Sequence, residues 1–215
     1  MTCSRCAAPL PAAGAPCAYC GAGPSAGPVV TAGAVGALHP GWSMLSAVEV
    51  TPGPAPGELV GAPKQHGRVW YTALRTHGIY DDVDLAATFR FLDTRAGAPM
   101  RVGFSIRLRD GCCYVPNLIG DGGFSLGAIV NEGEQKTWAQ LVPQGPSDVV
   151  DARVGAPNRL RVVAIRDRLQ VWINRVLMAS VRDDRLKQGY AEVMVNPGGA
   201  PGRVAWSALT LSVPG

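Results

Sequence analysis

The chain has 215 residues, a formal net charge of +4 and 47% hydrophobic residues, which allows one or two domains with a sizeable core. The mild positive charge argues against a dedicated nucleic-acid-binding protein, because such proteins concentrate more Lys and Arg on one stripe. The weakly polar stretch 29–38 is too short to span a bilayer, and the N-terminus lacks the continuous apolar core of a signal peptide. The sequence therefore predicts a cytoplasmic protein without a membrane segment.

Four cysteines near the N-terminus form two Cys-x-x-Cys pairs. The pairs are Cys3 with Cys6 and Cys17 with Cys20, and ten residues separate them. A two-residue spacer lets a tight turn aim both sulfurs at one point, and four thiolates complete a tetrahedral Zn²⁺ site. With all four positions filled there is no open position for a catalytic water, so we expect structural zinc. Disulfides or free thiols are the alternative, although a chain without a secretory signal favours metal.

The chain divides into three zones. Residues 1–23 resemble the short zinc ribbons at the N-termini of many bacterial proteins, and this resemblance implies a docking module for a protein partner. Arg5 is its one charged side chain, which is too little for a phosphate-binding surface. Residues 24–40 carry no Asp, Glu, Lys or Arg and are rich in Gly, Ala and Pro, a composition typical of a linker. Residues 41–215 form the third zone.

The third zone consists of short runs in which apolar residues alternate with other residues. The clearest runs are 83–91, 102–108, 169–174 and 205–213, and Gly, Asp, Asn and Pro clusters separate such runs. A side-chain period of two predicts half-buried strands, and many short strands with regular turns predict an all-β sandwich. Residues 182–189 offer room for one short helical turn.

Several segments of this zone occur in a familiar order. They are 81–91, 102–107, 158–165, 169–174, 184–189 and 204–209. Together they resemble the concanavalin A-like lectin/glucanase jelly roll, in the branch with laminin-G-like and 3-keto-glycoside-hydrolase-related domains. The resemblance covers about residues 41–214 and implies a mostly β fold class, with a small zinc ribbon preceding a jelly roll. One departure is the hairpin Asn174–Arg175, where that group has Asn-Gly; we expect another turn type, because Arg disfavours positive φ.

The fold hosts lectins, glycosidases and interaction modules, so function must be argued from side chains. Trp42, Trp70, Trp138 and Trp206 are more typical of packing, whereas Trp172 falls on the face opposite the apolar residues of its strand. In a jelly roll that face can be the concave, ligand-binding one. We therefore select Trp172, Gln170 and Asn174, with Arg107, as candidate residues for binding a glycan or peptide.

A catalytic role finds less support. Glycosidases need two carboxylates, and the Glu-x-Asp-x-x-Glu pattern of the related glucanases is absent from the chain. Asp81, Asp82 and Asp84 are interpreted as surface turn residues, with a calcium site as the weaker alternative. The three histidines, His39, His66 and His77, have no paired spacing. Cys112 and Cys113 are interpreted as strand residues, one facing the core and one facing outward.

Positive charge concentrates late in the chain, where residues 158–187 carry eight Arg and Lys against three Asp. A solvated face with salt bridges explains this cluster, and an acidic partner is the alternative. The overall prediction is a non-catalytic interaction protein that binds a protein through its ribbon and a glycan or protein through its jelly roll. A carbohydrate-active hydrolase of the keto-glycoside-hydrolase-related type is the first alternative. A nucleic-acid-associated protein is the second.

Overall fold

The computed structural model describes residues 29–31, 41–65, 70–93 and 99–214. Those residues form fifteen β-strands and no α-helix, so the mostly β fold class predicted from the sequence is confirmed. The zinc ligands predicted at Cys3, Cys6, Cys17 and Cys20 lie outside the described residues. In the described part of the chain, no helix is long and apolar enough to cross a membrane.

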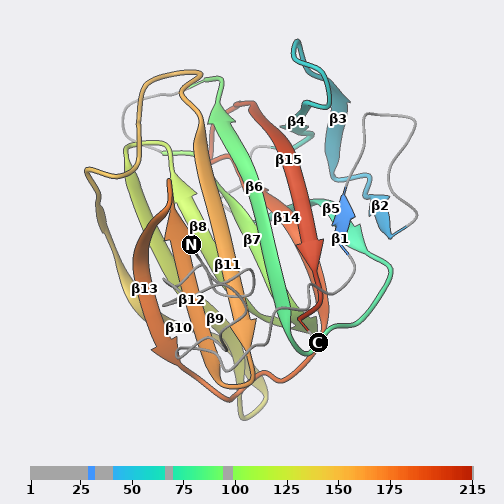
Figure 1. The fold of residues 1–215 in the computed structure, drawn as a ribbon, viewed down its shortest axis with the longest axis vertical. Coiled ribbons are helices and arrows are strands. Elements are labelled where there is room, and N and C mark those ends of the chain that lie inside the picture. The colour runs from blue at the N-terminus through green and yellow to red at the C-terminus, as the bar shows by residue number, and fades with distance from the viewer. Residues whose placement is uncertain (1–28, 32–40, 66–69, 94–98, 215) are drawn as a thin grey trace, which may run out of the picture.

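The strands form two antiparallel sheets, which make the two layers of a jelly-roll sandwich (Figure 1). The eight-stranded sheet contains, in spatial order, β13 (Val176–Arg182), β12 (Arg168–Ile173), β11 (Asn158–Ile165), β6 (Val83–Phe91), β15 (Val204–Ser212), β4 (Leu59–Pro63) and β3 (Val48–Pro52), and β1 (Val29–Thr31) also pairs with β15. The seven-stranded sheet contains β10 (Gln135–Pro146), β9 (Gly123–Glu132), β8 (Cys112–Ile119), β7 (Arg101–Arg109), β14 (Tyr190–Asn196), β5 (Tyr71–Thr76) and β2 (Trp42–Met44).

Alternating apolar side chains fill the space between the sheets. Leu85 and Phe89 of β6 and Phe104 and Ile106 of β7 are fully buried, as the period of two predicts. The rings of Phe89 and Phe104 lie 5.5 Å apart between centroids with an interplanar angle of 57°, a tilted arrangement that aromatic pairs favour. This core leaves each sheet with one outer face, and those two faces are the surfaces on which a ligand could lie.

The last strand departs from its predicted alternation. The register of β15 against β6 shifts between Ser207 and Thr210, and Ala208 has a φ of 50°. This bulge reverses the face of the preceding residues, so that Val204 and Trp206 enter the core in place of Ala205 and Ser207. The prediction that one unbroken alternation runs through 205–213 is therefore wrong for the first half of the strand.

The β12–β13 hairpin also differs from expectation. Asn174 and Arg175 have φ values of 48° and 73°, so both central residues adopt the positive φ that a two-residue type I′ turn requires. The side chain of Asn174 supports this turn. Its oxygen accepts a hydrogen bond from the Arg159 amide (2.8 Å), and its nitrogen donates to the Val149 carbonyl (2.8 Å). The expectation of another turn type is therefore wrong, because Arg175 adopts the positive φ that Gly usually takes in this turn.

Two further segments differ from their predicted character. Residues 29–31, within the predicted linker 24–40, pair with Thr210–Ser212 as strand β1. Residues 183–189, where a helical turn was possible, form an irregular crossover from β13 in one sheet to β14 in the other. A second crossover, residues 77–82, leads from β5 to β6, and the two crossovers join through the mutual backbone hydrogen bonds of Tyr80 and Gly189.

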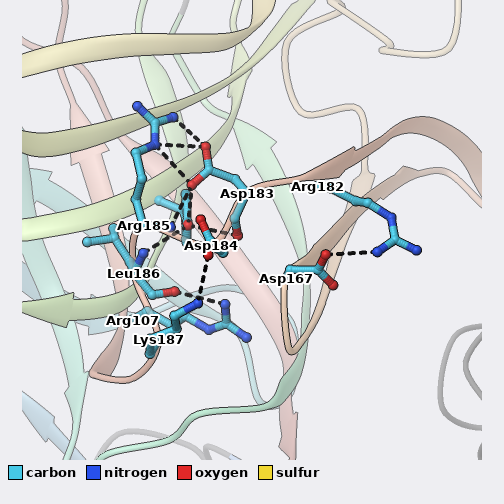
Figure 2. A network of polar contacts seen from close by, with 9 residues as sticks. Arg107, Asp167, Arg182, Asp183, Asp184, Arg185, Leu186 and Lys187 are labelled. Atoms are coloured by element: carbon cyan, nitrogen blue, oxygen red, sulfur yellow. Dashed lines mark hydrogen bonds and ion pairs between the residues drawn. The ribbon is translucent and has the colours of Figure 1, made fainter.

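Polar contacts fasten the 183–189 crossover to β8 (Figure 2). The hydroxyl of Tyr114 donates to the Asp183 carboxylate (2.7 Å) and accepts from the Leu186 amide (3.1 Å). Arg185 donates from Nε to both oxygens of the same carboxylate, at 3.0 and 2.9 Å. Burial raises the pKa of Tyr114 to about 12, so the hydroxyl stays protonated and able to donate.

We expect this network to weaken in acid. Burial alone would raise the pKa of Asp183, but the hydrogen bonds from Arg185 and Tyr114 hold it below the ordinary 3.8. The stabilisation is therefore complete above the unfolded pKa of about 3.8 and is lost as the pH falls below it through the folded pKa. Urea unfolding at about pH 6 and about pH 3 should show that Asp183→Asn is destabilised by about 1–3 kcal/mol at the higher pH and by less at the lower. An equal deficit at both pH values would contradict the assignment.

Candidate functional site

Two of the four candidate ligand-binding residues, Gln170 and Trp172, lie on the outer face of the eight-stranded sheet. Their neighbours in the strand, Val171 and Ile173, are fully buried in the core. Trp172 is partly buried, and its indole N–H is buried with no hydrogen-bond partner among the described residues. It pairs in register with Arg161, which binds the carboxylate of Asp84 through two guanidinium nitrogens. On this face Arg161 and Asp84 therefore satisfy each other, whereas the indole N–H of Trp172 stays unbonded within the described part of the chain.

The other two candidates lie elsewhere. Asn174 holds the β12–β13 turn through the hydrogen bonds described above. Arg107, with a φ of 55°, is 1% exposed and donates from Nε to the Asp81 carbonyl (2.8 Å) and from Nη1 to the Leu186 carbonyl (3.0 Å). Figure 2 shows its guanidinium beside the 183–189 crossover. The four candidates are thus spread over an outer face, a turn and the interior, and they do not form one site.

The acidic and basic clusters are largely structural. Asp84 is not a surface turn residue, since it lies within β6 and is 8% exposed. Burial raises its pKa, and the hydrogen bonds and charge of Arg161 oppose that rise. Four of the eight late cations bind carboxylates, namely Arg161 with Asp84, Arg182 with Asp167, Arg185 with Asp183 and Lys187 with Asp184. These pairs favour the salt-bridge explanation of the late charge.

The outer face of the seven-stranded sheet has a different character. On β14, Ala191 and Val193 face the core, so Glu192 and Met194 face outward, and on β9 Leu126 faces the core between two outward residues. The outward residues of the central strands include Thr72, Arg75, Arg101, Gly103, Ser105, Cys113, Val115, Asn117, Ile119, Ser125, Gly127, Ile129, Tyr190, Glu192, Met194 and Asn196. Polar, aromatic, apolar and small side chains are mixed here, and Arg75 and Glu192 form one charged pair.

Arg75 and Glu192 form the charged part of this face. Glu192 is 2% exposed, and its carboxylate accepts hydrogen bonds from Arg75 Nε (2.6 Å) and from the Thr72 hydroxyl (3.1 Å). The guanidinium of Arg75 also lies 5.6 Å from the centroid of the Tyr190 ring, in cation–π geometry. The Arg75 side chain remains 41% exposed. A buried carboxylate thus orients an accessible guanidinium.

An exposed tryptophan occupies the other side of the face. Trp138 of β10 is 44% exposed, and a side chain on Gly127 of the neighbouring strand would collide with its six-membered ring. The indole therefore lies down on the sheet over Gly127, where the glycine leaves room for it. Gln140, the register partner of Gly127, is exposed beside the ring. From the sequence we expect Trp138 to be a packing residue. Its exposure could not be predicted, because it depends on the pairing of β9 with β10, which the sequence does not display.

Buried polar atoms line the floor between these two sides. Asn117 is 1% exposed and donates to the Ser125 hydroxyl (2.9 Å), and its side-chain oxygen has no hydrogen-bond partner among the described residues. An unmet buried acceptor is costly. Cys113 faces this floor as well. Burial raises the pKa of its thiol to about 11, which makes it a small apolar group rather than a nucleophile.

Carboxylates are sparse on this face. The strands of the seven-stranded sheet carry Glu192 and, at the end of β9, Glu132. Glu192 faces Arg75 rather than a second carboxylate. Across the described ranges, no group of three or more His, Cys, Asp or Glu side chains is placed to hold a metal ion.

Comparisons with known proteins bear on the fold. No protein-family model matches the chain, and no curated protein matches it in sequence. A carbohydrate-binding module from Bacillus subtilis has a TM-score of 0.59 at 11% identity, over 80% of this chain and 95% of that one. A β-glucanase from Bacillus licheniformis has a TM-score of 0.59 at 8% identity (88% and 98% covered), and a glycosidic hydrolase has 0.57 at 9% (87% and 95%). At these identities the likeness establishes a jelly roll of the concanavalin A-like type and leaves function to the site.

Proposed function

We propose that this protein is a non-catalytic glycan-binding protein whose ligand lies on the outer face of the seven-stranded sheet. The observation that carries the proposal is the exposed ring of Trp138, which lies over Gly127 with one ring face toward the sheet and the other toward solvent. A sugar ring presents an apolar C–H face and a rim of hydroxyls. It therefore suits an aromatic surface that has a few oriented polar groups around it.

The surroundings of Trp138 supply those polar groups. Gln140 is exposed next to the ring, and the guanidinium of Arg75 lies on the same face, with four strands between β10 and β5. Hydroxyls can both donate and accept, so a glycan could bond to the exposed amide of Gln140. The fold shared with a carbohydrate-binding module supports this reading, and the arrangement of side chains is its main basis.

A hydrolase of the keto-glycoside-hydrolase-related type is the alternative, and the buried carboxylate of Glu192 is the observation that favours it. Glycosidases of the usual kinds act through two carboxylates about 5–9.5 Å apart. The charged group that contacts the Glu192 carboxylate is the guanidinium of Arg75 and not a second carboxylate. This arrangement supports glycan binding over hydrolysis. Release of reducing ends from a polysaccharide, abolished by Glu192→Gln, would favour the hydrolase instead.

The chain offers a matched pair of variants for testing the binding face. Trp138→Ala and Trp172→Ala each remove one indole from the outer face of a different sheet. On a panel of soluble polysaccharides, isothermal calorimetry should show affinity reduced at least about tenfold by Trp138→Ala. We expect Trp172→Ala to bind as the wild type does, and thermal unfolding should show both variants folded. Loss of binding in Trp172→Ala with retention in Trp138→Ala would place the ligand on the eight-stranded sheet and refute the proposal.

The N-terminal cysteines complete the proposal. We infer from their spacing that Cys3, Cys6, Cys17 and Cys20 hold a structural Zn²⁺, and from the resemblance to bacterial zinc ribbons that this segment docks a protein partner. The full-length protein should contain about one zinc ion per chain by atomic absorption, and Cys17→Ser with Cys20→Ser should abolish it. Cys112→Ser, a control in the jelly roll, should leave the zinc content unchanged. Zinc-free wild-type protein would refute the assignment.

A further inference from the structure

The charge on the glycan-binding face is uneven, and Lys136 is its most distinctive member. Lys136 lies two residues before Trp138 on β10, so both side chains leave the strand on the same face, about 7 Å apart along it. Its ammonium lies at Gly111, in the β7–β8 turn, where an added side chain would collide with it. The Lys136 side chain thus extends across β9 toward the β7–β8 turn, on the same face of the sheet as the exposed indole over Gly127.

Lys136 has no carboxylate partner in the part of the chain that the structure describes. Lys187, by contrast, binds Asp184 at 3.2 Å, and Arg161, Arg182 and Arg185 bind carboxylates in the same way. An exposed lysine on the same face as an aromatic platform is available to an anionic group of a polymer that stacks on that platform. No hydrogen bond within the described ranges uses the three N–H donors of this ammonium.

Arg75 offers a second cationic position on the same face. Its Nε is fixed by Glu192, which leaves the two terminal nitrogens of the guanidinium without a hydrogen-bond partner among the described residues. Those terminal N–H groups form the fork that binds carboxylate or sulfate in a bidentate manner. Four strands lie between β5 and β10, so the two strands are about 24 Å apart at a spacing of about 4.8 Å, and the Lys136 side chain covers part of that separation by reaching to the β7–β8 turn. Two separated cations suit a polymer better than a single sugar.

We propose, on the basis of the glycan-binding function above, that the ligand is an acidic polysaccharide. Its carboxylate or sulfate groups bind Lys136 beside the sugar stacked on Trp138, and a second acidic group along the chain binds Arg75. Along the central strands the face carries one opposing charge, Glu192, and that charge is buried and already bonded. Lys136 and Arg75 therefore provide the specificity for charge, whereas Trp138 provides the stacking surface.

The test compares one polymer with and without its charge. The probes are polygalacturonate and the same polymer after reduction of its carboxyl groups, with dextran sulfate as a sulfated polymer and random-sequence duplex DNA as an unrelated polyanion. The variants of the full-length protein are Lys136→Gln and the charge-matched control Lys187→Gln. Lys136 is exposed and forms no ion pair with a described carboxylate, so its substitution should leave the fold intact.

We expect Lys136→Gln to bind polygalacturonate about fivefold to tenfold more weakly than the wild type, with Lys187→Gln unaffected. Binding of polygalacturonate should weaken as the salt concentration rises. The wild type should bind the reduced polymer more weakly than the charged one, and Lys136→Gln and Lys187→Gln should bind the reduced polymer equally well. The same losses with dextran sulfate instead of polygalacturonate also support the proposal and identify the acidic group as a sulfate.

Three results would overturn it. Equal binding of the charged and the reduced polymer, with no effect of Lys136→Gln, rejects the acidic ligand while Trp138-dependent glycan binding stands. Duplex DNA bound as tightly as polygalacturonate, with the same loss in Lys136→Gln, shows a general polyanion site and rejects the glycan class. Absence of binding to every polysaccharide rejects both this inference and the proposed function.

Discussion

The arrangement of the sandwich depends on one buried charge, the guanidinium of Arg107. A cation in the interior is costly unless its N–H groups are bonded, and here the carbonyls of Asp81 and Leu186 accept them while Asp82 lies 3.6 Å away. Burial lowers the pKa of Arg107, and the nearby acidic groups oppose that change. The two carbonyls belong to the two crossovers at that end of the molecule, so one side chain joins the segments that pass between the sheets. The outer faces remain free for other uses.

The predictable parts of the fold are those decided by neighbouring residues. The strands at 83–91 and 102–108 could be located because their alternation depends on the chain's own local order. The bulge at Ala208 could not, since it arises from pairing with β6, far away in the sequence. Arg175 likewise takes a positive φ because a two-residue turn between paired strands requires it, and the Asn174 side chain supports that turn.

In the candidate site, too, positions decided by neighbouring residues could be predicted, and positions decided by pairing with a distant strand could not. Trp172 stands in a clear alternating run, so its outward position could be predicted, and that position is where the structure places it. Trp138 stands among polar residues, and its exposure depends on Gly127, eleven residues earlier and on another strand. Arg107 follows a recognisable strand motif, but a positive φ turns it inward. A sequence displays which residues alternate; it does not display which glycine leaves room for which ring.

The two outer faces differ in how much of their polar capacity the fold itself consumes. On the eight-stranded sheet, Arg161 and Asp84 satisfy each other and are largely buried, so a ligand there would have to compete with an existing ion pair. On the seven-stranded sheet, the one buried carboxylate uses a single nitrogen of Arg75, and Lys136 is held by no described carboxylate. Binding at that face adds hydrogen bonds without breaking any that hold the sandwich. A face whose donors remain unused after folding is the face to which a ligand can contribute most.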